Sequence, residues 1–157
     1  MLPGRHTIHH LGLLTYGGVL LGLRGLEGAH AVEVEGSEGD VLLDCNGDVT
    51  VKGVVLLPHA AQRAVVAHRG TQRLSGCVVQ GGKGGVWGMC DAAIHMEDSR
   101  IEGCSGKGVN LRQGTSTVLR RCSWRSRRRC RWSRACNLGQ THVPTADDAG
   151  VTADESR

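Results

Sequence analysis

The sequence contains very few aromatic residues. Phenylalanine is absent, and the 157 residues include only one tyrosine and three tryptophans. Helical bundles and β-sandwiches normally fill their cores with bulky rings, so this composition argues against both. Glycine is abundant at 24 residues, about twice its average share. Because glycine is a helix former about 1 kcal/mol worse than alanine, the composition also argues against a coiled coil.

The sequence also lacks the cysteine pattern of a disulfide-stabilised or zinc-binding domain. Its seven cysteines are an odd number, so they cannot all pair within the chain, and no two form a C-x-x-C motif. Free cysteine packs as a small buried hydrophobic residue and is typical of a reducing compartment. The apolar run 11–23 is too short and too interrupted by glycine to cross a bilayer. We therefore expect free thiols, a cytoplasmic location and no membrane association.

Positive charge is concentrated in one segment. Eight arginines fall within residues 120–134, and without them the net charge of +4 would be −4. Such a segment can neutralise phosphates, and Trp124 and Trp132 within it can stack on bases. A basic tail without a selected partner is the simpler interpretation, because no recognised nucleic-acid-binding fold precedes it. Anion or nucleic-acid binding through this segment remains an alternative function.

The chain carries an internal repeat, which takes precedence over any local reading of secondary structure. The segments 51–56, 74–79, 96–101 and 119–124 start 23, 22 and 23 residues apart. Equivalent positions in these segments form four columns. They are Val51, Leu74, Met96 and Leu119; Val54, Cys77, Ser99 and Cys122; Leu56, Val79, Ile101 and Trp124; and the turn positions Gly53, Gly76, Asp98 and Arg121.

A second short strand follows within each repeat, beyond a glycine-containing loop. Its common pattern is a glycine or another small residue followed by valine, and Val65, Val86 and Val109 lie 21 and 23 residues apart. Upstream, Ala31–Glu35 and Val41–Cys45 continue the strand pattern, with a connecting turn at 36–40. Short strands that alternate inward and outward cannot bury their apolar sides alone, but stacked coils about 4.8 Å apart bury a continuous column.

The sequence therefore predicts a short all-β protein, a right-handed parallel β-helix of the pectin-lyase type. We expect a lead-in or cap over 1–17, β-helix repeats over 18–124, and a tail over 125–157 that is arginine-rich, then polar and disordered. The register is expected to fail after Trp124, which leaves the last coil open. Either the chain is a fragment or altered end of a longer β-helix protein, or the tail folds back as a cap; we favour the first.

No residue pattern identifies an active site. Glycoside hydrolysis needs two carboxylates about 5 to 9.5 Å apart, and of the outward positions Lys52, Ser75, Glu97 and Arg120 only Glu97 is acidic. The glycine loops resemble phosphate cradles, but Gly84 follows Lys83 where a P-loop has serine or threonine. The histidines at 6, 9 and 10 lack further metal ligands at a suitable spacing. We assign no catalytic, cofactor-binding or metal-binding residue, we expect no cofactor, and the partner-binding residues stay unknown.

The segments 39–45 (GDVLLDC), 49–57 (VTVKGVVLL) and 70–77 (GTQRLSGC) resemble the C-terminal β-helix of the SHC SH2-domain-binding protein and nessun dorma family. The resemblance covers residues 2–124. It implies a non-enzymatic scaffold of the cytoplasm and cytoskeleton that acts at the central spindle and midbody in cytokinesis. It also implies protein partners, either centralspindlin or signalling adaptors, and an association with glycans. A polysaccharide-active β-helix enzyme is the other alternative function.

Overall fold

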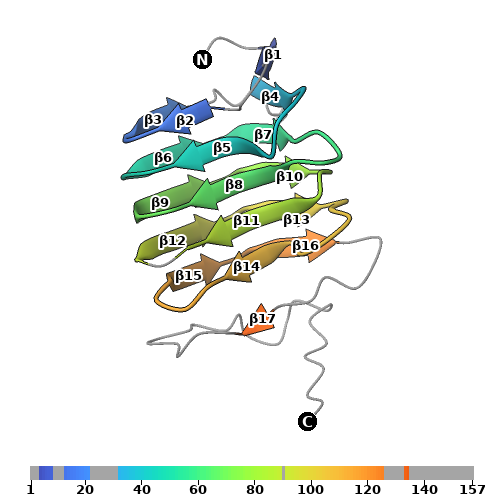
Figure 1. Cartoon of the computed structure of the whole chain (residues 1–157). Coiled ribbons are helices and arrows are strands. Elements are labelled where there is room, and N and C mark those ends of the chain that lie inside the picture. The colour runs from blue at the N-terminus through green and yellow to red at the C-terminus, as the bar shows by residue number, and fades with distance from the viewer. Residues whose placement is uncertain (1–3, 9–12, 22–31, 90, 126–132, 135–157) are drawn as a thin grey trace.

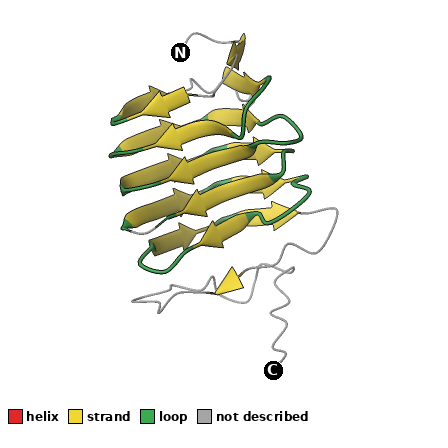
Figure 2. Ribbon diagram, viewed as in Figure 1, coloured by secondary structure: helices red, strands yellow, loops and turns green. Residues whose placement is uncertain are grey.

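The computed structural model describes residues 4–8, 13–21, 32–89, 91–125 and 133–134. Every regular element in this part of the chain is a β-strand of two to six residues (Figure 2). The strands are joined by short corners, and successive coils lie on top of one another (Figure 1). The predicted all-β solenoid is thus confirmed.

The strands form three parallel sheets that run along the stack of coils, here called A, B and C. Sheet A contains β1 (Gly4–Ile8), β4 (Val32–Gly36), β7 (Val54–Leu57), β10 (Val78–Gln80), β13 (Arg100–Glu102) and β16 (Ser123–Arg125). Sheet B contains β2 (Leu13–Thr15), β5 (Val41–Cys45), β8 (Arg63–Ala67), β11 (Gly84–Gly88), β14 (Val109–Leu111) and β17 (Ser133–Arg134). Sheet C contains β3 (Gly18–Leu21), β6 (Val49–Lys52), β9 (Gly70–Ser75), β12 (Ala92–Glu97) and β15 (Ser116–Arg120). Each strand pairs with the strand one coil away, which is the arrangement that defines a β-helix.

Strand pairing places the predicted columns in register. In sheet C, Leu74 pairs with Val51 on one side and with Met96 on the other, and Met96 pairs with Leu119. The same holds for two further columns, which are Leu56, Val79, Ile101 and Trp124 in sheet A, and Val65, Val86 and Val109 in sheet B. Equivalent positions of successive coils are therefore stacked in register, as the spacing predicts.

The core runs without interruption along the solenoid axis. Val51, Leu74 and Met96 are only 2–3% exposed, and they belong to one apolar cluster that extends over the described coils. Six polar residues of the described part are also buried, which the sequence does not suggest, and Gln72 in sheet C is one of them. The amide nitrogen of Gln72 donates to the carbonyls of Gly47 and Arg69, at 2.8 and 2.9 Å. These bonds tie a coil corner to the coil beside it and satisfy the buried amide nitrogen, while Gln72 Oε1 has no hydrogen-bond partner within the described residues.

The predicted turn column is confirmed by the backbone. Gly53, Gly76, Asp98 and Arg121 all have positive φ angles, of 63, 59, 49 and 49°. Glycine adopts this left-handed conformation without a Cβ clash, whereas in other residues the Cβ makes the conformation unfavourable. The two later coils therefore hold a strained aspartate and a strained arginine where the two earlier coils have glycine.

The structure differs from the sequence prediction at both ends of the repeat. In the expected lead-in, β1 and β2 already pair with β4 and β5, so strand positions of the first coil precede residue 18. After Trp124 the register was expected to fail, but β17 pairs with β14 and extends sheet B by one strand. That expectation was wrong because parallel pairing uses backbone groups, and Ser133 and Arg134 supply them without the glycine-valine pattern. The disorder expected for the rest of the tail lies outside the described residues.

Candidate functional site

The outer face of sheet C is a flat surface with two outward rows of side chains. Because residues alternate along a strand, the neighbours of the buried column Val51–Leu74–Met96–Leu119 point outward. The first row is Lys52, Ser75, Glu97 and Arg120, as predicted, and the second is Thr50, Arg73, His95 and Val118. We call these two rows the sheet C face.

Positive charge dominates the sheet C face. Lys52, Arg73 and Arg120 are exposed, and Arg73 pairs in register with His95 on the next strand. Partial burial lowers the pKa of His95, and the positive charges of Arg73 and Arg120 lower it further. Both guanidinium groups therefore lie close enough to the imidazole to disfavour its protonated form.

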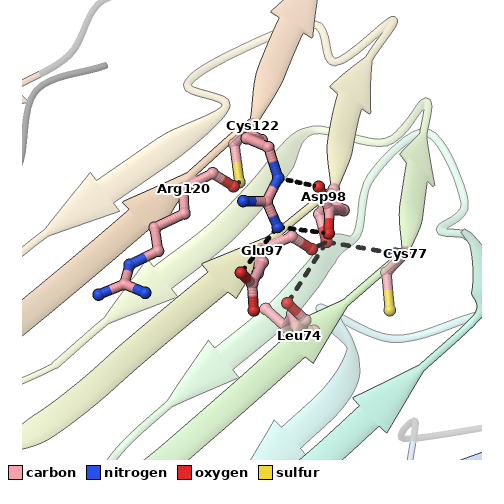
Figure 3. A network of polar contacts seen from close by, with 8 residues as sticks. Leu74, Cys77, Glu97, Asp98, Arg120 and Cys122 are labelled. Atoms are coloured by element: carbon pink, nitrogen blue, oxygen red, sulfur yellow. Dashed lines mark hydrogen bonds and ion pairs between the residues drawn. The ribbon is translucent and has the colours of Figure 1, made fainter. Parts of the chain in front are cut away.

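The single carboxylate in these rows is already engaged by an arginine at the neighbouring corner. Arg121 Nη2 lies 2.8 Å from Glu97 Oε1, and Arg121 Nε lies 2.5 Å from Asp98 Oδ1. These carboxylates raise the pKa of Arg121 further above its ordinary value, mainly through the hydrogen bond to Asp98. Figure 3 shows this network, with the Arg120 side chain extending away from it. Glu97 is thus part of an ion-pair network and has no second carboxylate across a binding groove.

Buried thiols stack beside the same corner. Cys77 Sγ lies 3.3 Å from the Val51 carbonyl oxygen, and the Cys77 amide donates to Ser99 Oγ at 3.2 Å. Burial raises the pKa of the Cys77 and Cys122 thiols, and it raises that of Cys45 to about 12, with a further contribution from Asp44. Protonated, buried thiols are poor nucleophiles. Cys45, Cys77, Cys104 and Cys122 are free, which confirms the thiol prediction for the described cysteines.

The outer face of sheet B carries Trp87, to which no sequence motif assigns a role. The Arg63 guanidinium lies 4.3 Å from the centre of the Trp87 ring, a cation–π distance. A Cβ on Gly84 would lie 2.8 Å from Trp87 Nε1, so glycine leaves room for the indole. Trp87 Nε1 and Arg63 Nε are buried and have no hydrogen-bond partner in the described part of the chain. In the sequence, Trp87 follows Val86 of a buried column by one residue. Strand alternation therefore indicates that Trp87 points outward.

The remaining sequence motifs either have a structural role or are not brought together as a site. The Gly-Lys-Gly corners at 82–84 and 106–108 stack on each other, with the Ser105 amide donating to the Gly82 carbonyl at 2.9 Å. Among the described residues, no three histidine, cysteine or acidic side chains form a group suited to a metal ion. His6 lies in β1, while residues 9 and 10 lie outside the described part. No helix in the described part has the length and hydrophobicity to cross a membrane.

Comparison with known proteins supports the architecture and one group of relatives. A family model named right handed beta helix region matches residues 39–141. SHC SH2 domain-binding protein 1 from Homo sapiens and from Mus musculus is 29% identical over 119 residues, and homolog B from Xenopus laevis is 30% identical over 119 residues. These alignments cover 74% of this chain but only 17–18% of each relative, so the chain spans less than a fifth of the length of these proteins. No solved structure matches.

These findings confirm the resemblance expected from the segments 39–45, 49–57 and 70–77. The matched region contains the stacked columns and the positive-φ corners, so sequence similarity and geometry agree on the same part of the molecule. The chain belongs to the right-handed β-helix family.

Proposed function

We propose that this chain is a non-enzymatic binding module that presents the flat faces of a β-helix to protein partners in an adaptor role. The observation that carries this proposal is its similarity to proteins named as binders of an SH2 domain. The fold supports it, because the stacked coils hold the outward side chains at a fixed spacing on rigid sheets. Such a surface can bind a partner without a conformational change.

The alternative of a polysaccharide-active enzyme finds less support in the described residues. Catalysis of glycoside cleavage needs two carboxylates that flank the bond to be broken. On sheet C, Glu97 shares the guanidinium of Arg121 with Asp98, and the other outward residues of its row are cationic or neutral. Release of products from polygalacturonate by the purified chain would contradict the proposal.

An SH2 domain is the first partner to test. Tyr16 is the only tyrosine of the chain, and it is 72% exposed at the corner between β2 and β3. A phosphotyrosine-dependent contact would have to use this residue. For the cellular role we propose the cytoplasm and the cytoskeleton, with action at the central spindle and midbody in cytokinesis and with centralspindlin or signalling adaptors as partners.

The test is calorimetric titration of the purified chain with the SH2 domain of an SHC adaptor. We expect binding, and a matched set of chains shows its mode: unmodified, phosphorylated at Tyr16, and Tyr16→Phe. If binding depends on the phosphate, only the phosphorylated chain binds the SH2 domain. If binding uses a sheet face, all three chains bind it. Absence of binding in all three chains would refute an SH2-domain partner.

Glycan binding is a second candidate function, favoured by the outer face of sheet B. Trp87 lies half-buried there beside Arg63, and both side chains have a buried N–H group with no hydrogen-bond partner among the residues that the structure describes. Aromatic rings flanked by polar groups suit sugar rings, which are apolar on their faces and polar at their edges. Quenching or enhancement of tryptophan fluorescence by neutral oligosaccharides in the wild-type chain, and its loss in Trp87→Ala, would support this function; no change with any of the sugars would exclude it.

A further inference from the structure

Three cations on the sheet C face have no acidic partner within the described part of the chain. Lys52, Arg73 and Arg120 are exposed, and none of them forms an ion pair there. The acid nearest to them in the rows, Glu97, is held by Arg121. The face therefore carries a net positive charge that the folded coils leave uncompensated.

The register fixes the spacing of these charges. Lys52, Ser75, Glu97 and Arg120 are successive partners in one row, so Lys52 and Arg120 are three strand spacings apart, or about 14 Å between Cα atoms. Arg73 lies on β9, the strand next to that of Lys52. It comes two residues before Ser75, so it lies about 7 Å from the first row, measured along the strand. An extended peptide advances about 3.4 Å per residue, so four residues match the longer distance.

The surface between the cations allows close approach of a peptide backbone. Ser75, which lies between Lys52 and Glu97 in the first row, is short and only partly exposed. His95 lies between Arg73 and Arg120 and is disfavoured in its charged form by both. A carboxylate placed among these groups would offset the two guanidinium charges and favour the charged form of the imidazole.

The number of charges favours a protein segment over a nucleic acid. Nucleic-acid-binding proteins of known salt dependence neutralise about 6–10 phosphates, whereas this face offers three cations in a small area. An acidic peptide with two or three carboxylates matches the face in charge and in length. Ion pairs on an open face give a weak and salt-dependent contact, which is typical of adaptor interactions.

We propose that the outer face of sheet C binds an extended acidic segment of a protein partner, with carboxylates four residues apart on Lys52 and Arg120 and a third carboxylate on Arg73. This assignment rests on the proposed function as a protein-binding module and names the face and the chemistry of its partner. The backbone of the bound segment runs across the strands, along the stack of coils.

The test compares two double variants of the full chain with the same loss of charge. Arg73→Gln with Arg120→Gln removes two cations from the face, and Arg69→Gln with Arg100→Gln removes one exposed cation from a corner and one from sheet A. The probe is a twelve-residue glutamate-containing peptide, with the glutamine version as control. We expect the face variant to bind the acidic peptide at least tenfold more weakly than the wild type, and the control variant to stay within about twofold.

Equal loss in both variants would overturn the proposal, because the contact would then follow overall charge, including that of the arginine run. Equal binding of the glutamine peptide would also overturn it. A twenty-nucleotide single strand that binds the same face more tightly than the acidic peptide would assign the face to nucleic acid instead. Circular dichroism of both variants establishes that they retain the fold.

A second measurement needs no variant. In the wild-type chain, the bound peptide should raise the pKa of His95 and shift its imidazole NMR signals, since a carboxylate favours the charged ring. Unchanged His95 signals at saturating peptide would refute this site. If the SHC SH2 domain binds the face variant as well as the wild type while the acidic peptide binds neither, the face assignment fails and the proposed function stands.

Discussion

Truncation of one side chain in the stacked column should show how the solenoid is held together. Leu74 is 2% exposed and lies between Val51 and Met96, so Leu74→Ala removes three carbons from a closed site. At about 0.8 kcal/mol per buried carbon, the transfer cost is about 2.4 kcal/mol, and the cavity brings the total to about 3–4 kcal/mol. Against a total stability of about 5–15 kcal/mol for a domain, this is a large loss.

The matched control is the same substitution at the end of the same column. Leu119 pairs with Met96 but is only partly buried, so Leu119→Ala should cost about 1 kcal/mol because the site is open to solvent. Urea unfolding followed by far-UV circular dichroism measures both. With a slope of about 2 kcal/mol per M, the midpoint should fall by nearly 2 M for Leu74→Ala and by about 0.5 M for Leu119→Ala. Equal shifts would refute the argument that a continuous central column stabilises the fold.

Three further perturbations test other parts of the coil. Gly85→Ala should lower the free energy of unfolding in urea by about 3 kcal/mol, because the new Cβ would lie 2.2 Å from a backbone oxygen of the next coil. In the control Gly17→Ala, the new Cβ lies 3.4 Å from its nearest backbone oxygen, so this change should cost less than about 1 kcal/mol. Arg121→Gly should melt at a higher temperature than Arg121→Ala, since both lose the ion pairs with Asp98 but only glycine relieves the positive φ; the reverse order would refute strain at this corner. Burial raises the pKa of the Cys45 thiol to about 12, so folding keeps this thiol protonated. Its contribution to stability should be fully present below pH 9 and should fall between about pH 9 and 12, where the thiol of the unfolded chain ionises first. In alkaline urea titrations, a Cys45→Ala chain should show a smaller fall in stability than the wild type.

The periodic part of the fold could be predicted from the sequence because one physical requirement recurs in every coil. The column of Val51, Leu74 and Met96 repeats at 22–23 residues, and parallel strands bury such a column only when equivalent positions stack. The turn column was equally visible, since Gly53 and Gly76 recur at the same place. Local rules and the global fold agree throughout this region.

Contacts between different sheets or corners could not be predicted in the same way. Gln72 is an ordinary polar residue in the sequence, and its burial depends on carbonyl groups at two coil corners. The stacking of Arg63 on Trp87 needs the room left by the missing Cβ of Gly84, and it forms only when β8 and β11 pair. The strand at Ser133–Arg134 follows from free backbone groups at the edge of β14, for which no side-chain pattern is required.

The same strands build the core and the sheet C face, so the two are linked. Arg73 and Leu74 are neighbours in β9, while Arg120 follows Leu119 in β15. In a solenoid, stability is nearly a sum of coil and interface contributions, and a terminal coil opens more easily than a central one. Leu119→Ala should therefore weaken acidic-peptide binding by loosening Arg120 while most of the fold stays intact. A Leu119→Ala chain that binds the peptide as tightly as the wild type would mean that Arg120 does not contribute to the face.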